Sequence, residues 1–314
     1  MTLSFGFDLS LAVLTLAVAG YAIGARESFA SVVAFISYGV LLALVWVRLS
    51  AVDVALTEAA IGSGVTGALL IGAAAKVGEG AVDAPRSVRG AGRLLTALFC
   101  IATTLGIATA FLSLPEKAPT LAPLAAEHLP STGLGNPVTA VLLSYRAIDT
   151  LLESVVLVFA VVGVWTFASD RDWGGRPESP GKDRPEQPLT FLGQILPPLG
   201  ILVGVHLVWT GATEPGGAFQ GGTVLAAAWI LVMAAGLRKP PSIEGAWLRF
   251  ALIGGPALFL GVGVAGFALA KAFLAYPEGH SKAFILVIEA ALTFSIAIAL
   301  GLLALGAPGR KGHP

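Results

Sequence analysis

The sequence predicts an all-α protein that crosses a membrane about nine times. Charged residues make up 12% of its 314 residues and hydrophobic residues 56%, with a mean hydropathy of +0.84. An ordinary soluble domain has about 25% charged residues. Several uninterrupted apolar stretches reach the roughly 20 helical residues needed to cross the hydrocarbon core. So few charges cannot cover a water-facing surface, which excludes a soluble enzyme.

Nine apolar stretches follow one another along the chain, and each predicts a helix. The fifth is longer than one span needs, so we expect it to begin at the interface or to run tilted. No Lys or Arg precedes Arg26, so we expect the first stretch to be a retained helix and not a signal peptide. The predicted helices cover residues 7–24, 28–47, 54–75, 93–112, 138–168, 191–210, 217–237, 250–273 and 283–305.

Three polar stretches separate these helices and are predicted loops. Residues 76–92 are rich in Gly, residues 113–137 contain five prolines, and residues 169–188 are densely charged. With the N-terminus outside, 14 of the 19 basic residues fall on the inner side. Lys and Arg concentrate on the cytoplasmic side of membrane proteins. The sequence therefore predicts an N-out, C-in orientation in the inner (plasma) membrane.

Net charge and cysteine content exclude several functions. The formal net charge is zero, which gives no electrostatic reason to expect a nucleic-acid partner. The one cysteine, Cys100, lies inside an apolar run, where we interpret it as a small packing residue. One thiol forms no intramolecular disulfide and no cluster or zinc motif. We expect no cofactor, no metal centre and no covalent catalysis.

Seven ionisable residues of the predicted helices are candidates for an ion or proton path, because each costs at least about 2.5–3.5 kcal/mol in the membrane unless it is paired, hydrated or neutral. A structural ion pair explains Arg146 and Asp149, and offsets of three and seven place Glu153 on the same helical face. Lys271 is explained by snorkelling to the outer interface, and His206 by a hydrogen bond to a backbone carbonyl. The seven are Glu58, Arg146, Asp149, Glu153, His206, Lys271 and Glu289.

The carboxylates Glu58, Glu153 and Glu289 are harder to explain as structural residues, because each lies well inside an apolar helix. A desolvated carboxyl can take up and release a proton near neutral pH, and a row of such groups joined by water forms a proton path. Carboxylate oxygens also suit a dehydrated Na⁺. The sequence does not separate these two possibilities.

A glycine-rich segment begins the seventh predicted helix. Gly217 and Gly221 form a G-x-x-x-G pair, which lets a neighbouring backbone approach closely. Thr213, Glu214 and Gln220 gather at the same helix start, which indicates a polar cavity or a contact between subunits. Plain helix packing is the alternative interpretation of the segment, whose candidate packing residues are Pro215, Gly216, Gly217, Gly221 and Gly222.

Three segments resemble modules of one family of membrane complexes. VALTEAAIGSGVTGALLIGA at 54–73 resembles the small module at the C-terminal end of the large subunit of Mrp-type Na⁺/H⁺ antiporters, which also occurs as a small separate protein in membrane-bound hydrogenases. NPVTAVLLSYRAIDTLLES at 136–154 resembles the two-helix module that follows it. EPGGAFQGGTVLAAAWIL at 214–231 resembles the signature of the antiporter's B-type subunit, although Ala218 stands where that signature usually has a third glycine.

The resemblance implies three modules, at residues 1–90 with three helices, 91–175 with two and 176–314 with four. It implies that Glu58 matches the carboxylate of the first module. The R-x-x-D-x-x-x-E pattern of Arg146, Asp149 and Glu153 matches the second, and His206 belongs to the third. The implied function is a subunit of a monovalent cation/proton antiporter. Its partners would be Na⁺, H⁺, the lipid bilayer and other membrane subunits, including a large antiporter-like subunit.

Two alternatives stay open. The chain would look nearly the same as a membrane-arm subunit of a redox-driven ion pump such as a membrane-bound hydrogenase. A purely structural membrane scaffold is the other possibility, and it predicts that neutralising the buried carboxylates leaves transport intact.

The charge asymmetry generates a test of orientation. Cysteines placed in the 169–188 loop should resist a membrane-impermeant thiol reagent added to intact cells, because that loop faces the cytoplasm. The extent of labelling, measured on the isolated chain, checks this. Ready labelling of the loop would overturn the N-out, C-in orientation.

Overall fold

The fold is all-α throughout the residues that the computed structural model describes, which are 2–79, 90–115, 119–177 and 187–309. Within those ranges the one β-type pairing is an isolated antiparallel bridge between Pro177 and Pro308. The elements are α1 (Thr2–Gly24), α2 (Ser28–Arg48), α3 (Val52–Thr57), η1 (Glu58–Val65), α4 (Thr66–Glu79), α5 (Gly90–Leu112), α6 (Ala122–His128), η2 (Leu129–Thr132), α7 (Pro137–Ala140), η3 (Val141–Tyr145), α8 (Ala147–Trp165), α9 (Gln187–Thr210), α10 (Ala218–Ala234), α11 (Ala246–Ala270) and α12 (Ser281–Leu305).

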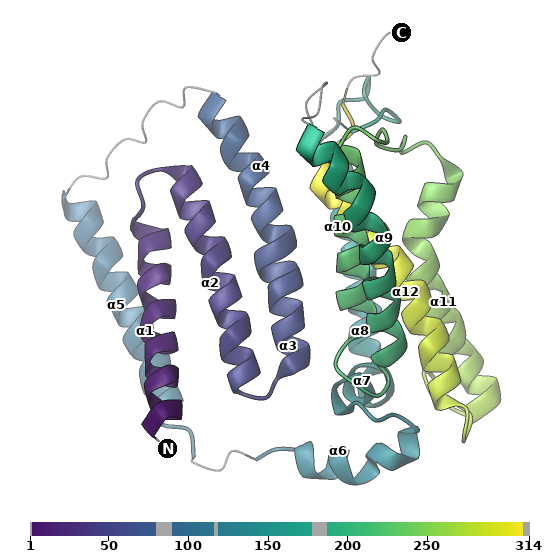
Figure 1. Cartoon of the computed structure of the whole chain (residues 1–314). Coiled ribbons are helices and arrows are strands. Elements are labelled where there is room, and N and C mark those ends of the chain that lie inside the picture. The colour runs from purple at the N-terminus through teal and green to yellow at the C-terminus, as the bar shows by residue number, and fades with distance from the viewer. Residues whose placement is uncertain (1, 80–89, 116–118, 178–186, 310–314) are drawn as a thin grey trace.

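Eight helical segments of the described chain are long and apolar enough to cross a membrane. One of them, Val52–Ala74, runs continuously through α3, η1 and α4. The segment expected at 217–237 is the shorter apolar helix α10, Ala218–Ala234. The chain is therefore a multi-pass, all-α membrane protein, as its composition predicts. The start of α1 and the end of α12 lie at opposite ends of the bundle (Figure 1).

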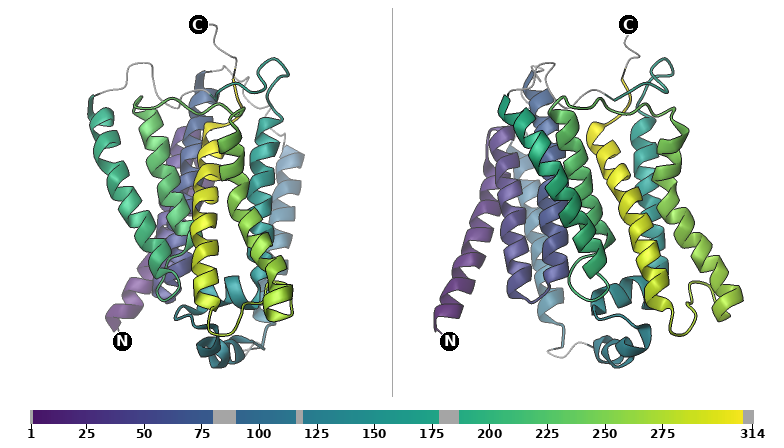
Figure 2. Two further views of the ribbon diagram at one scale, coloured as in Figure 1. Left: turned by 90° about the vertical axis from the view of Figure 1, so that its right-hand side faces the viewer. Right: turned by 45° about the vertical axis from the view of Figure 1, so that its right-hand side comes forward.

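The helices form two groups. In the first, α1 packs on α2, and α2 packs on the continuous α3–η1–α4 segment. In the second, α10 packs between α9 and α12, and α12 also contacts α8 and α11 (Figures 1 and 2). Contacts of α10 with α3 and η1 join the groups. We call the end of the bundle at which α1 begins the N-terminal end; α6 lies across it (Figure 1).

The centre of the second group is α12, the most buried of the membrane-crossing helices. Its inward-facing residues Ile285, Ile288, Leu292 and Ile296 are at most 1% exposed and belong to the main apolar core. Lipid supplies no hydrophobic driving force between helices, so close packing holds them together. α12 is therefore the element against which α8, α10 and α11 are positioned.

One membrane-crossing segment contains a π-helical stretch, and another is preceded by one. The third predicted helix is continuous, but it is π-helical from Glu58 to Val65. The prediction of one long helix at 138–168 is wrong. That segment is α7, then the π-helical η3, then a break at Arg146 with φ −130° and ψ 39°, then α8. π-Helical turns inside α-helices are rare and occur frequently at functional sites.

Two other expectations are corrected by the structure. The predicted loop at 113–137 contains α6 and the 3₁₀ turn η2 in its described part. Cys100 is exposed on α5, a helix with no buried residue, so it is not a packing residue within this chain. Residues 80–89 and 178–186, which hold parts of the predicted 76–92 and 169–188 loops, lie outside the described residues.

The packing of α11 on α12 generates a stability test at adjacent glycines. A Cβ added at Gly255 would lie 2.8 Å from Ala291 O and 2.9 Å from Leu292 Cα, whereas one at Gly254 would meet nothing within 4 Å. Gly255→Ala should therefore lower the free energy of unfolding by about 1–3 kcal/mol, as overpacking typically does. Gly254→Ala is the matched control and should change it by less than about 1 kcal/mol. Unfolding of the purified protein in mixed micelles measures both, and equal effects would contradict the packing.

Candidate functional site

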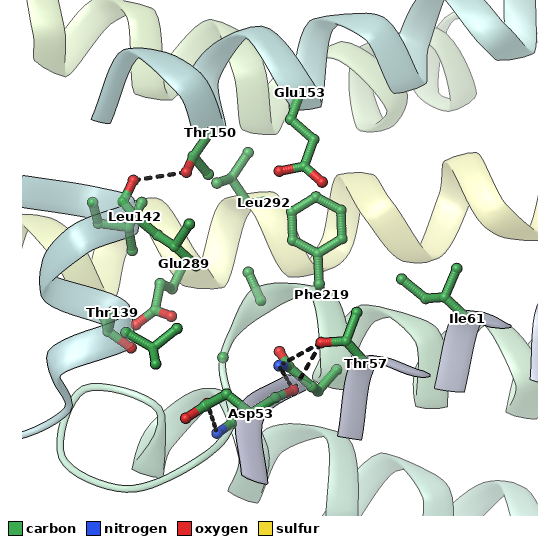
Figure 3. A pocket seen from close by; sticks show the side chains of 16 residues that line it. Asp53, Thr57, Ile61, Thr139, Leu142, Thr150, Glu153, Phe219, Glu289 and Leu292 are labelled. Carbon is green, nitrogen blue, oxygen red and sulfur yellow. Dashed lines mark hydrogen bonds between the residues drawn. The ribbon is translucent and has the colours of Figure 1, made fainter. Parts of the chain in front are cut away.

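A cavity of about 230 Å³ lies where α3–η1, the 137–153 segment, the start of α10 and α12 meet (Figure 3). It thus draws its walls from both groups of helices. Its lining combines carboxylates, hydroxyls and an amide with apolar side chains. The lining residues are Asp53, Thr57, Ile61, Val138, Thr139, Leu142, Leu143, Thr150, Glu153, Gly216, Gly217, Ala218, Phe219, Gln220, Glu289 and Leu292.

Glu289 is the most buried carboxylate of this cavity. Its helix, α12, is packed on several sides, so the residue is only 2% exposed. The backbone of Ala218, at the first turn of α10, interacts favourably with its carboxyl group. Its Oε2 atom has no hydrogen-bond partner among the described residues. A buried carboxyl oxygen without a partner carries a large desolvation cost, so the group needs a proton, a water molecule or a cation.

A turn of two glycines brings the start of α10 against Glu289. Gly216 and Gly217 have φ values of 155° and 121°, a region that L-residues rarely adopt. A Cβ at Gly216 would lie 2.5 Å from Leu207 O, and one at Gly217 would lie 3.0 Å from Glu289 Oε1. The backbone conformation therefore favours glycine at both positions, and at Gly216 the space does so as well.

Hydrogen bonds of Asp53 join this turn to the first group of helices. Its Oδ1 accepts a hydrogen bond from the backbone N–H of Gly216 at 3.0 Å and one from Asn136 Nδ2 at 3.3 Å. Gln220 Nε2 donates to the Asp53 carbonyl at 3.4 Å and to Thr57 Oγ1 at 3.1 Å. Asp53 is buried, at 9% exposure, although it is in the first turn of α3. Hydrogen bonds from N–H donors compensate for the burial of its carboxylate.

Side chains satisfy the carbonyls that the broken fifth span leaves free. Thr150 Oγ1 donates to Leu142 O at 2.7 Å, and the Tyr276 hydroxyl donates to Leu143 O at 2.8 Å. Burial raises the pKa of the Tyr276 hydroxyl, which keeps this donor protonated. Backbone groups must be satisfied within the protein at membrane depth. The irregular backbone beside the cavity is thus a stable feature.

The electrostatic character of the cavity is acidic. Three carboxylates line it, Asp53, Glu153 and Glu289, and none of its described lining residues is Lys, Arg or His. The carboxylates are spread over three elements, and no group of three acidic, His or Cys side chains in the described chain is placed to hold a metal ion. Such a lining suits protons or a hydrated monovalent cation that moves between separate groups.

The predicted site residues divide between the cavity and the outside of the bundle. Glu153, Glu289, Gly216 and Gly217 line the cavity. Arg146 and Asp149 do not line it. They form the expected ion pair, with 2.5 Å between Arg146 Nη2 and Asp149 Oδ2, on an exposed surface. The break at Arg146 changes the helical offset for Arg146 only: Asp149 and Glu153 are four residues apart on α8 and share a face, and of these three residues only Glu153 lines the cavity.

Glu58 lies in a different place, at the interface of α2 and η1. A Cβ at Gly62 would overlap its Oε1 atom, and one at Gly39 would lie 3.4 Å from that atom. Its carboxyl therefore occupies space that two glycines leave free. His206 is exposed on α9, and Lys271 is exposed at the end of α11 with φ 63°. Neither residue lines the cavity.

The other residues of the glycine segment have packing contacts. A Cβ at Gly221 would lie 2.8 Å from Gly204 O, so α9 and α10 approach closely there. A Cβ at Gly222 would lie 2.8 Å from Ile296 Cγ2, so α10 also packs closely on α12. Pro215 lies at the N-terminal end of the bundle and lines a second cavity beside Glu214.

Sequence reasoning missed several residues of this site. In the sequence Asp53 marks only the border of a turn, and Thr57, Thr139 and Thr150 are inconspicuous in apolar helices. The polar gathering at Glu214 and Gln220 did indicate a cavity, and Gln220 does line it. One further signal was available. Asn136 precedes Pro137, a pattern typical of a helix start. Its Oδ1 atom accepts a hydrogen bond from the backbone N–H of Val138 at 2.8 Å.

Comparison with known families divides the chain into two recognisable parts. Residues 13–79 match the family of the D-type subunit of MBH, MbhD. Residues 188–307 match the domain related to the MnhB subunit of Na⁺/H⁺ antiporter. The chain therefore has an MbhD-like segment followed by an MnhB-like segment, which we call the MbhD and MnhB modules. The MbhD module supplies Asp53 and Thr57 to the cavity, and the MnhB module supplies Glu289 and the glycine turn.

One curated relative and two solved structures resemble this chain. Protein MJ1307 of Methanocaldococcus jannaschii, itself uncharacterised, is 33% identical over 154 residues, which are 44% of this chain and 59% of that protein. A chain of the Mrp complex from Dietzia sp. DQ12-45-1b matches over 98% of this chain and 35% of its own length, with a TM-score of 0.74 and 24% identity. This chain therefore spans about three-fifths of the first relative and about a third of the second.

A second solved structure has a related fold. It is a chain of the membrane-bound sulfane sulfur reductase (MBS), an archaeal respiratory membrane complex. The match covers 68% of this chain and 97% of that chain, with a TM-score of 0.55 and 22% identity. Both structures are multisubunit membrane complexes, and at these identities the likeness establishes a shared fold.

Proposed function

We propose that this chain is a membrane subunit of an Mrp-type monovalent cation/proton antiporter. The order of an MbhD module and an MnhB module supports the proposal, as does structural likeness along 98% of the chain to a chain of an Mrp complex. On this proposal the chain works in the plasma membrane beside other subunits, including a large antiporter-like one. It acts as part of a transporter, with Na⁺ and H⁺ as the transported ions.

The observation that carries the mechanism is the acidic cavity between the modules. Glu289 has a buried oxygen in it that no described residue hydrogen-bonds, and Glu153 lines the same cavity from the fifth span. Thr57, Thr139 and Thr150 supply hydroxyl groups around them. A proton or a hydrated cation can be passed between carboxylates through water held by such groups. We propose that Glu153 and Glu289 form the central part of the ion path.

The remaining predicted residues have separate roles in this proposal. Glu58, between α2 and η1, belongs to a branch of the path on the MbhD side. Arg146, Asp149, His206 and Lys271 lie on exposed surfaces, where they would meet partner subunits or lipid headgroups. Modules at 1–90, 91–175 and 176–314 remain our proposed division of the chain.

A redox-driven pump is the second candidate, and the MbhD match and the MBS likeness favour it. The MBS match, however, covers only 68% of this chain, against 98% for the Mrp chain. The antiporter proposal is therefore preferred. Co-purified subunits decide between the two, because a redox-driven pump requires subunits that carry metal clusters.

Glu289 gives the main functional test. Glu289→Gln keeps the shape of the side chain but cannot be titrated, so the assembled complex should lose most of its cation/proton exchange. Exchange in everted vesicles measures this, and a native gel checks assembly. Glu278→Gln is the matched control, since Glu278 lies in the α11–α12 loop away from the cavity, and it should exchange normally. Full exchange by an assembled Glu289→Gln complex would reject the role and favour a scaffold.

Glu58 gives an independent test of the MbhD branch. Glu58→Gln should assemble normally and lose most exchange, while Glu58→Asp should retain part of it because a shorter carboxyl can still be titrated. The same vesicle assay applies to both variants. A structural Glu58 makes the opposite prediction, that Gln performs as well as Glu because it removes the desolvation cost of a charge.

A further inference from the structure

A second cavity, of about 260 Å³, lies at the N-terminal end of the bundle, next to the acidic cavity. We call it the vestibule. The turn before α3, the Asn136 region and residues 213–215 line it. Ser50, Thr213 and Glu214 belong to this lining, and Ser50 and Thr213 are exposed, so the vestibule opens at the surface.

Asp53 lies between the two cavities. It lines the vestibule and also the acidic cavity, and among their described lining residues only Val138 does the same. Figure 3 shows the Asp53 side chain at the margin of the acidic cavity, on the side of the glycine turn. A route from the surface at this end to Glu289 therefore passes Asp53.

Hydrogen bonds of Asp53 close the passage between the vestibule and the acidic cavity. Asp53 Oδ1 accepts from Gly216 N at 3.0 Å, and Asn136 Nδ2 donates both to Asp53 and, at 3.0 Å, to the carbonyl of Glu214. The bonds join three segments far apart in sequence, at 53, 136 and 214–216. Hydrogen bonds to an ionised group are the stronger ones, but each can be exchanged for a bond to water.

We infer that Asp53 is a positioning residue that closes the route by which water and monovalent cations from the N-terminal end reach the Glu289 cavity. When the Asp53–Gly216 and Asp53–Asn136 bonds open, the vestibule and the acidic cavity become continuous. The carboxylate of Asp53 then faces the passing cation or hydrated proton. This role rests on the proposed ion path, but the closure itself is a property of the structure that can be measured without transport.

Cysteine accessibility in the assembled complex tests the inference. In a Cys100→Ala background, Ala218→Cys reports on the acidic cavity, because Ala218 lines it and is 8% exposed. Thr213→Cys reports on the vestibule. The probe is a membrane-impermeant, cationic methanethiosulfonate added to sealed vesicles of each orientation, and the side from which Thr213→Cys reacts identifies the vestibule side.

Asp53→Asn keeps one oxygen that can accept the bonds from Gly216 N–H and Asn136 Nδ2, but it removes the negative charge that strengthens them. The rate of modification of Ala218→Cys from the vestibule side should then rise about tenfold or more, because a hydrogen bond to a charged group is strong enough to oppose opening by that factor. Thr213→Cys should react equally with either residue at 53. Asp8→Asn is the matched control: Asp8 pairs with Arg48 at 2.7 Å away from both cavities, and its loss should leave Ala218→Cys unchanged.

If the Asp53→Asn complex does not assemble, a second variant tests the same closure. Asn136→Ser keeps a hydroxyl that can cap Val138 N–H but loses the amide donor to Asp53 and Glu214, so it should speed the modification in the same direction. An unchanged rate in an assembled variant would overturn the inference, as would fast modification of Ala218→Cys with Asp53 intact. These outcomes are independent of exchange: the closure can fail while Glu289→Gln still abolishes transport, and the reverse can also occur.

Discussion

The structure depends on one constraint. The hydrocarbon core of a membrane contains no water, so every polar backbone and side-chain group must find a hydrogen-bond partner within the protein. The backbone is irregular in three places, η1, the break at Arg146 and the turn before α10. Irregular backbone is tolerated in a membrane where it is buried in protein or lines a cavity. The Arg146 break and the glycine turn both adjoin the acidic cavity, and side chains of Thr150, Tyr276 and Asp53 bond their free groups.

The same constraint explains why the acidic cavity lies between the modules. A regular helix satisfies its own backbone and presents only side chains, so two regular helices pack with little room for polar groups. Where helices break, backbone donors and acceptors point inwards and must form hydrogen bonds with carboxylates, hydroxyls and amides. Side chains that form hydrogen bonds in this region are those of Asn136, Thr139 and Gln220, whereas Glu289 retains one oxygen without a partner in the described chain. A proton or a cation can bind at this Glu289 oxygen.

Glycine makes this arrangement possible on α10, a short helix packed on two sides. Gly221 admits the backbone of α9 and Gly222 admits α12, so the helix can lie deep between them. Gly216 and Gly217 then turn the chain so that the Ala218 backbone faces Glu289 and the Gly216 N–H faces Asp53. One glycine-rich segment thus lies against Glu289 and takes part in the proposed closure of the route from the vestibule. Helix packing and the proposed ion path both depend on this local conformation.

The sequence by itself determined the membrane class, the helical fold, most of the helices and the carboxylates of interest. Composition and apolar run length suffice for these, because the hydrocarbon core imposes one length and one backbone structure on any span. It could not show that the 138–168 segment breaks at Arg146, since its apolar pattern continues through the break. It also could not show that Asp53 lies between two cavities, because its partners are 83 and 163 residues away. Only the tertiary structure showed that Glu153 and Glu289 line one cavity and that Glu58 lies at another interface. The physical reason is that helix breaks and glycine contacts decide which face of each helix turns inwards. These features follow from packing between segments that are distant in the sequence.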